Sequence, residues 1–155
     1  MPSTPPSTSS ELPEIMDNLY RDFILEHYRE PHNKGLLEPH DLHFADSNPT
    51  CGDEMSMTFI LDEDKLRVAD VAFDGRGCAI SQASASILTD ELRGKSLDEL
   101  RAIDPRDVIE NLGVPIGPAR LKCALLSYKV LQGAVIGAEA RWPDEAAVLV
   151  GGSAP

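Results

Sequence analysis

The sequence predicts a single domain that combines a small antiparallel β-sheet with helices, and three observations lead to this fold class. Two segments of alternating apolar residues lie close together in the middle of the chain, at 55–61 and 68–73. Apolar residues at helical spacing occur before and after them, at 15–28, 79–92 and 118–135. The chain has 155 residues, 42% of them hydrophobic, which suffices for one core and is too short for two ordinary domains.

The first helix is expected over 15–28, and Pro31 ends it because proline restricts the residue before it to extended backbone. Residues 1–13 are mainly Ser, Thr and Pro, so little burial can offset the entropy of ordering them. We therefore expect a disordered arm over 1–13, one domain over 14–138 and a loose tail over 139–155.

The strands are expected where apolar residues alternate with polar ones. Met55, Met57 and Phe59 share one side of the segment 55–61, and an acidic turn leads from it to 68–73. A further short strand at 42–45 can join them. These neighbouring segments predict an antiparallel sheet, because short turns connect antiparallel strands.

The helices that follow the strands have recognisable start signals. Segment 79–92 places alanines and serines between its apolar residues, which predicts a helix that packs closely against its neighbours. Ser96 and Glu99 form the capping-box pattern of a short helix. Pro118 suits the first turn of a last long helix, expected to end near residue 137.

Composition limits the partners and the compartment. The net charge of −12, from 26 acidic and 14 basic residues, opposes a phosphate-binding surface and so disfavours nucleic acid. The beginning of the chain lacks a secretory signal, and three cysteines are an odd count for a disulfide scaffold. Lys129 interrupts the most apolar stretch, at 124–138, which excludes a membrane span. We expect a soluble, cytoplasmic protein.

Three cysteines and one acid form the candidate metal site. Cys51 and Asp53 are two residues apart, and on extended backbone such side chains project to the same side. Cys78 stands at the strand-to-helix junction and Cys123 in the first turns of the last helix. The gaps of 27 and 45 residues between the cysteines exclude the compact paired motifs of zinc fingers and ferredoxins. A shared site of three sulfurs and one oxygen therefore requires the complete fold.

A second interpretation of these cysteines stays open. Lone cysteines are most often small buried hydrophobic residues, and three in 155 is no enrichment. Two features favour the metal site instead. Glycines flank Cys51 and Cys78, and the basic residues Arg76, Arg120 and Lys122 stand near the thiols, where positive charge stabilises a thiolate.

Three motifs carry a resemblance to a known family. They are NPTCGD at 48–53, GRGCAISQASAS at 75–86 and PARLKCALLSYKVL at 118–131, and the opening LYRDFILEHYREPHNKG at 19–35 adds to them. The chain resembles the U-type iron–sulfur cluster assembly scaffolds, which include IscU, SufU and the N-terminal domain of NifU. The resemblance covers about residues 16–135, in order.

The resemblance implies an α+β fold of the SufE/NifU-like kind, with a three-stranded antiparallel sheet packed by helices. It implies that Cys51, Asp53, Cys78 and Cys123 converge at one end of the sheet as ligands of zinc or iron. It places Arg120 beside the site, where it can pair with Asp53. The partner it implies is a pyridoxal-phosphate-dependent cysteine desulfurase, with Cys51 as the acceptor of persulfide sulfur.

Members of this family follow two mechanisms. IscU-type members build a [2Fe-2S] cluster transiently and pass it to apo iron–sulfur acceptor proteins, whereas SufU-type members hold zinc and relay persulfide sulfur. The motifs of this chain are similar to the SufU type, and Lys122 stands where IscU-type proteins carry a histidine. The LPPVK-like chaperone recognition sequence of IscU is missing as well. The stretch between Gly94 and Arg120, however, lacks the insertion typical of SufU.

Three functions remain in consideration. The first is an assembly scaffold that accepts sulfur and holds nascent clusters, and the second is a zinc-dependent sulfurtransferase that relays sulfur without building the cluster. The third is a structural zinc-binding interaction module. Whether the chain is an enzyme stays open between them.

Our first prediction concerns the resident metal. We expect protein purified in air to hold about one zinc ion per chain, because Zn²⁺ is redox-inert and outcompetes Fe²⁺ for such donors. Elemental analysis of freshly purified protein measures this directly. A result with no stoichiometric metal contradicts the prediction.

Overall fold

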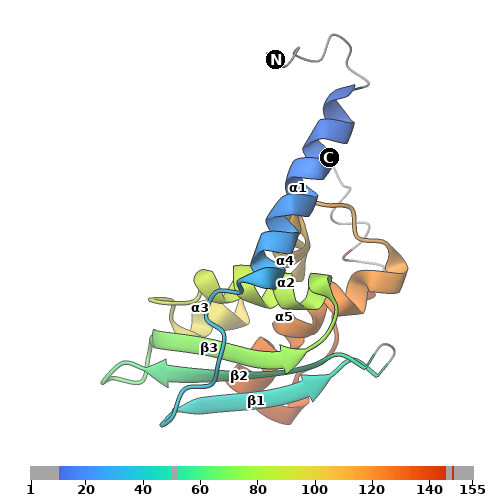
Figure 1. Cartoon of the computed structure of the whole chain (residues 1–155). Helices are drawn as coiled ribbons and strands as arrows, with labels where there is room; N and C mark the ends of the chain where they lie inside the picture. Colours follow the sequence, from blue (N-terminus) through green and yellow to red (C-terminus); the bar gives the residue numbers. More distant parts are fainter. Residues whose placement is uncertain (1–10, 50–51, 146–147, 149–155) are drawn as a thin grey trace.

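The computed structural model describes residues 11–49, 52–145 and 148, which form a three-stranded sheet and a set of helices (Figure 1). The elements in chain order are α1 (Glu11–Arg29), β1 (Leu42–Ser47), β2 (Glu54–Leu61), β3 (Val68–Arg76), α2 (Ala79–Asp90), α3 (Leu97–Arg101), α4 (Pro105–Leu112), η1 (Pro118–Arg120), α5 (Leu121–Ile136) and η2 (Gly137–Glu139). The predicted α+β class is confirmed. No described helix combines the length and apolarity that a membrane crossing needs.

The sheet has the order β1-β2-β3 and is antiparallel throughout. Phe44 of β1 lies opposite Met57 of β2, and Met57 lies opposite Phe73 of β3. Met57 and Phe73 are fully buried, as the alternating pattern predicts. The short strand expected at 42–45 exists as β1 and is two residues longer.

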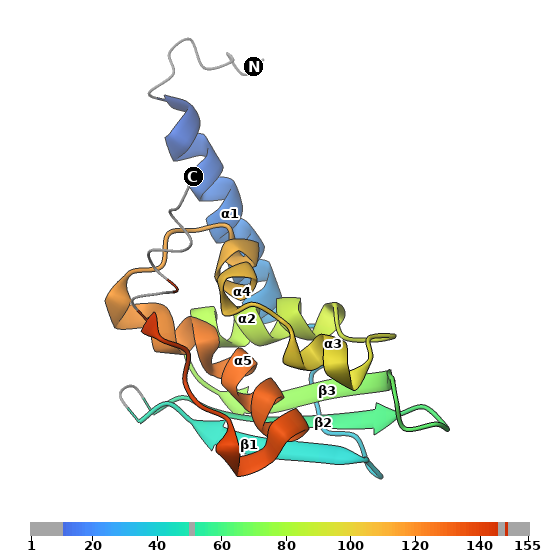
Figure 2. The ribbon, with the colours of Figure 1, turned by 180° about the vertical axis from the view of Figure 1, so that it is seen from behind.

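Helices α2 and α5 lie side by side against the sheet, and Figure 2 shows α5 from the opposite side. Small residues allow this close approach. The hydroxyl of Ser84 on α2 donates a hydrogen bond to the carbonyl oxygen of Ala124 on α5 at 2.7 Å, and it lies 3.0 Å from the hydroxyl of Ser127. All three residues are essentially buried, so the predicted close packing of α2 is confirmed.

Helix α1 packs on α2 through its C-terminal half, while its N-terminal half extends away from the domain (Figure 1). Nδ1 of His27 lies 2.7 Å from the hydroxyl of Ser86, and burial lowers the pKa of His27, with a further contribution from His32. The helix begins at Glu11, four residues before the expected start. Residues 11–13 therefore belong to α1 rather than to the predicted arm, whose first ten residues lie outside the described part.

The described part of the C-terminal segment is packed against the domain, which corrects the expected loose tail. Ala140 and Val148 are 7% and 5% exposed. The ring of Trp142 lies 5.6 Å from Nζ of Lys122 and 5.8 Å from Nζ of Lys129, both on α5. A large aromatic surface and two nearby cations hold this segment in place.

Gly133 of α5 lies against Phe44 of β1 and generates our second prediction. A Cβ atom at this position would lie 2.3 Å from two ring carbons of Phe44. Alanine normally stabilises a helix interior by about 1 kcal/mol relative to glycine. We nevertheless expect Gly133→Ala to lower the free energy of unfolding by about 1–3 kcal/mol, because the ring or the helix must move.

Chemical denaturation measures this change. The double variant Gly133→Ala with Phe44→Leu removes the ring that the new methyl group meets, so the alanine should cost less in that background. A single variant as stable as the wild type, or more stable, contradicts the proposed packing.

Candidate metal centre

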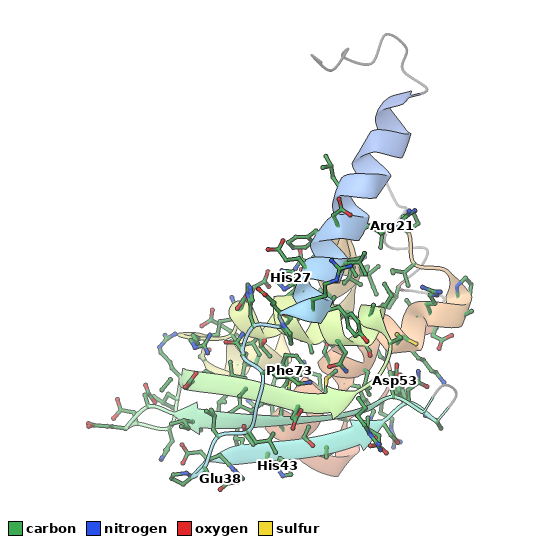
Figure 3. All side chains as sticks on the ribbon, viewed as in Figure 1. Arg21, His27, Glu38, His43, Asp53 and Phe73 are labelled. Atoms are coloured by element: carbon green, nitrogen blue, oxygen red, sulfur yellow. The ribbon has the colours of Figure 1, made fainter. Side chains whose placement is uncertain are left out.

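Three side chains with metal-binding atoms converge at one end of the sheet. Asp53 directly precedes β2, Cys78 directly precedes α2, and Cys123 lies in the first turn of α5. One donor atom from each, a carboxylate oxygen and two sulfurs, lies within 4.8 Å of the others. Figure 3 shows Asp53 at this end of the sheet. The fold thus brings together three of the four predicted ligands.

The fourth predicted ligand, Cys51, lies outside the described residues, as does Thr50. The residues on both sides of this pair are joined to each other. The backbone N–H of Asn48 donates to the carbonyl oxygen of Asp53 at 2.8 Å, and the N–H of Gly52 donates to the carbonyl oxygen of Asn48 at 2.9 Å. The described residues on either side of Cys51 are therefore joined next to Asp53.

Cys78 is the N-cap residue of α2. Its backbone is extended, with φ −71° and ψ 169°, and its sulfur accepts a hydrogen bond from the N–H of Ser81 at 3.5 Å. A cap of this kind satisfies one of the free N–H groups at the start of a helix. The sulfur is therefore fixed in direction while it remains exposed.

Asp53 is almost enclosed, with 5% of its surface exposed. Its Oδ1 accepts the backbone N–H of Cys78 at 3.3 Å, and its Oδ2 lies 3.8 Å from the sulfur of Cys78. A buried carboxylate needs such partners. The hydrogen bond orients the carboxylate toward the thiol, so a hard donor and a soft donor face the same point.

Cys123 is buried, with 7% of its surface exposed, and lies beside the side chain of Asn48. Nδ2 of Asn48 is 3.8 Å from the sulfur of Cys123, and only 1% of Asn48 is exposed. Sequence reasoning missed this contact. Asn48 was visible only as the first residue of a motif, and asparagine before proline is equally typical of an ordinary turn.

Two basic residues near the start of α5, Arg120 and Lys122, differ in their surroundings. Arg120 is exposed at the end of η1. Within the described residues no ion pair joins Arg120 to Asp53, so the expected pairing is not observed. Nζ of Lys122 lies 5.6 Å from the ring centre of Trp142 and 4.0 Å from a carboxylate oxygen of Glu145. Its ammonium is therefore engaged by the C-terminal segment.

A groove of about 840 Å³ opens beside the two thiols, and we call it the thiol groove. It runs between α1, the start of α2 and the loop before α5. Most of its lining is apolar, and the two guanidinium groups are its positive charges. Its lining residues are Arg21, Ile24, Leu25, Cys78, Ala79, Ile80, Val114, Pro115, Ile116, Ala119, Arg120 and Cys123.

The donor set fits a thiophilic metal ion. A tetrahedral zinc site with Zn–S bonds of about 2.3 Å places its sulfurs about 3.8 Å apart. The donor atoms of Asp53, Cys78 and Cys123 lie within 4.8 Å of one another, so an adjustment of about 1 Å closes them on one ion. Thiolates suit zinc and iron–sulfur clusters, whereas magnesium and calcium prefer all-oxygen sites.

Comparison with known proteins agrees with this fold. The model of the NifU-like N terminal domain matches residues 19–142, which is most of the chain. The chain therefore belongs to the NifU-like N-terminal domain family, and the resemblance drawn from its motifs is confirmed at the level of the family.

The curated relatives carry two kinds of name. The "zinc-dependent sulfurtransferase SufU" of Bacillus subtilis (strain 168) is 40% identical over 138 residues, covering 77% of this chain and 91% of that protein. The "iron-sulfur cluster assembly scaffold protein IscU" of Streptococcus pyogenes serotype M1 is 34% identical, covering 77% and 84%. The IscU scaffold of Escherichia coli (strain K12) is 30% identical over 119 residues, covering 75% and 91%.

The alignment lengths also show a difference in size. Seventy-seven percent of 155 residues is about 119, so about 19 of the 138 positions aligned with the Bacillus protein have no counterpart here.

Solved structures support the fold. A putative iron–sulfur cluster assembly scaffold protein for the SUF system from Fervidobacterium islandicum AW-1 superposes with a TM-score of 0.62 at 30% identity, covering 74% of this chain and 94% of that one.

Gly77 generates our third prediction. A Cβ atom at this position would lie 2.8 Å from Oδ1 of Asp53 and 2.4 Å from the hydroxyl of Ser81. We expect Gly77→Ala to push the carboxylate away from Cys78 and to weaken zinc binding by about 10-fold or more. Competition with a chromophoric chelator measures the affinity.

Gly117→Ala is the matched control, because a Cβ there would have no neighbour within 4 Å. The control should bind zinc like the wild type. Equal zinc affinities for Gly77→Ala and the wild type would show that the close contact at Asp53 does not support the centre.

Proposed function

We propose that this chain works in iron–sulfur cluster assembly, where it accepts sulfur from a cysteine desulfurase and holds the metal of the nascent cluster. The site is formed by Cys51, Asp53, Cys78 and Cys123. The observation that carries this proposal is the convergence of a carboxylate and two thiols within 4.8 Å, beside the loop that contains the third thiol. The names of the relatives, as scaffolds and as a zinc-dependent sulfurtransferase, support it.

The sulfur donor is a pyridoxal-phosphate-dependent desulfurase that carries a cysteine persulfide. The thiolate of Cys51 attacks the outer sulfur of that persulfide. A new S–S bond forms on Cys51, the S–S bond of the donor breaks, and the donor cysteine leaves as a thiolate. The exchange is balanced and needs no further oxidant or reductant. Such chemistry suits the cytoplasm, where thiols stay reduced.

The remaining residues hold the site ready for this exchange. When zinc is bound, it keeps the thiols deprotonated and reduces their reactivity. Asp53 offers a hard oxygen donor beside soft sulfur donors, so its bond to a thiophilic metal is the weakest of the site. Its hydrogen bond to the N–H of Cys78 keeps the carboxylate in place when the sulfur ligands rearrange.

The thiol groove gives the donor a route to the site. Its apolar lining suits a hydrophobic segment of the partner, and Cys78 and Cys123 lie at its wall. Arg21 and Arg120 provide positive charge along the same groove, which favours a thiolate or persulfide anion. We propose that the persulfide-bearing segment of the desulfurase enters here.

Two forms of this function differ in cargo. In the zinc form, sulfur is relayed and the cluster is built elsewhere. The contacts of Lys122 with Trp142 and Glu145 favour the zinc form. Lys122 stands in the place of the IscU histidine, and these contacts engage its ammonium group with the C-terminal segment. In the scaffold form, a [2Fe-2S] cluster is the cargo and is handed to apo acceptor proteins. The alignment with Escherichia coli IscU, which needs few gaps, favours the scaffold form.

Our fourth prediction tests the proposed function through Cys51. The wild type should raise the turnover of cysteine by its desulfurase, and Cys51→Ala should lose most of that stimulation, because no thiolate receives the sulfur. Asp98→Ala removes a carboxylate with 90% exposure and serves as the control that leaves stimulation unchanged. Alanine production with and without zinc is the measurement.

The outcomes separate the candidate functions. A structural zinc module leaves desulfurase turnover unchanged with the wild type and with both variants, which would overturn the proposal. The scaffold form yields a brown protein after reconstitution with iron and sulfide, and it transfers the cluster to an apo acceptor. The zinc form shows stimulation that depends on zinc and no such transfer.

A further inference from the structure

Asn48 is a buried amide at the base of the loop that contains Cys51. We propose that Asn48 is a positioning residue, whose side-chain amide holds the sulfur of Cys123 in the direction from which it binds the ion. The inference rests on the proposed function, because it assigns a role within the same site. It concerns how the ligands are held and adds no new ligand.

The side chain of Asn48 is buried beside Cys123. Only 1% of the residue is exposed, and Nδ2 lies 3.8 Å from the sulfur of Cys123, within reach of a long hydrogen bond to sulfur. Burying an amide is unfavourable unless its polar atoms find partners. The sulfur of Cys123 is such a partner, and it lies 75 residues away in the sequence. The contact therefore joins two distant segments of the chain.

The contact between Asn48 and Cys123 suits a deprotonated sulfur. A thiolate can accept a hydrogen bond and cannot donate one, so an amide N–H directed at the sulfur suits the deprotonated form that binds metal. The amide is neutral, and the contact therefore adds no charge that would compete with a bound cation. Hydrogen bonds of this kind orient ligands and set the affinity of metal sites.

A backbone hydrogen bond links Asn48 to Asp53. The N–H of Asn48 donates to the carbonyl oxygen of Asp53, so the two ends of the loop are joined. At one end the side chain of Asn48 contacts Cys123, and at the other the carboxylate of Asp53 accepts the N–H of Cys78. Each end is thus held by a different cysteine. Loss of the Asn48 contact should remove this support from the sulfur of Cys123, while the hydrogen bond between Asp53 and Cys78 remains.

Two substitutions test this assignment. Asn48→Leu keeps a similar shape without a donor, and Asn48→Ser is too short to reach the sulfur. We expect either variant to bind zinc about 10–100-fold more weakly, as is usual when a hydrogen bond to a metal ligand is lost. In the Co²⁺-substituted protein, the thiolate-to-cobalt absorption should move to longer wavelength, because the sulfur lone pair is no longer stabilised by an N–H.

Gln132→Met is the matched control. Gln132 is also a buried amide, with 6% exposure, and its Nε2 donates to the carbonyl oxygen of Leu100 at 2.9 Å. It lies nine residues beyond Cys123 on α5, about 14 Å along the helix. This variant should lose stability and keep both the zinc affinity and the cobalt spectrum of the wild type. A purely structural role for Asn48 predicts the same behaviour for its variants.

The results distinguish this inference from the proposed function. A wild type that binds zinc and stimulates the desulfurase, together with Asn48 variants whose zinc affinity and cobalt spectrum are unchanged, overturns the inference alone. A wild type that binds no metal overturns the proposed function. If one Asn48 variant fails to fold, the other decides the result by the same two measurements. Weaker zinc binding with a spectral shift supports the assignment.

Discussion

The close packing of α2 against α5 is the constraint on which the rest of the molecule depends. Each helix has a cysteine near its start: Cys78 is the N-cap residue of α2, and Cys123 lies in the first turn of α5. The bond from the hydroxyl of Ser84 to the carbonyl oxygen of Ala124 fixes how near the two helices lie and how they slide along each other. A larger side chain at 84 would separate the helices, because interiors are densely packed. The distance between the two sulfurs is therefore set by residues that have no metal chemistry.

Much of the fold was predictable because its signals are local. The alternating residues Met55, Met57 and Phe59 of β2 are all buried, and the capping box of Ser96 and Glu99 is formed as its spacing indicates. The ends of the domain were predicted less well. Ser10 directly precedes α1, but it belongs to a run of Ser, Thr and Pro residues, so the sequence did not single it out as a cap. The packing of the segment around Trp142 depends on two lysines of α5.

The site divides in the same way. The pairing of a thiol and a carboxylate at Cys51 and Asp53 is visible from their spacing alone, although Cys51 lies outside the described residues. The approach of Cys78 and Cys123 is not visible from spacing, because gaps of 27 and 45 residues leave their separation to the tertiary fold. The family resemblance supplied that expectation. Asn48 escaped notice because an amide contributes no donor atom that a search for ligands would select.

The C-terminal segment approaches the candidate metal centre through Lys122, the residue next to Cys123. Lys122 directly precedes Cys123, and an ammonium group at that position could oppose a bound cation if it faced the donors. Trp142 and Glu145 instead hold Nζ at 5.6 Å from the ring centre and 4.0 Å from a carboxylate oxygen. The family match extends to residue 142 and so includes this tryptophan. The C-terminal segment supplies none of the three donor atoms, but it engages the ammonium group of the residue next to Cys123.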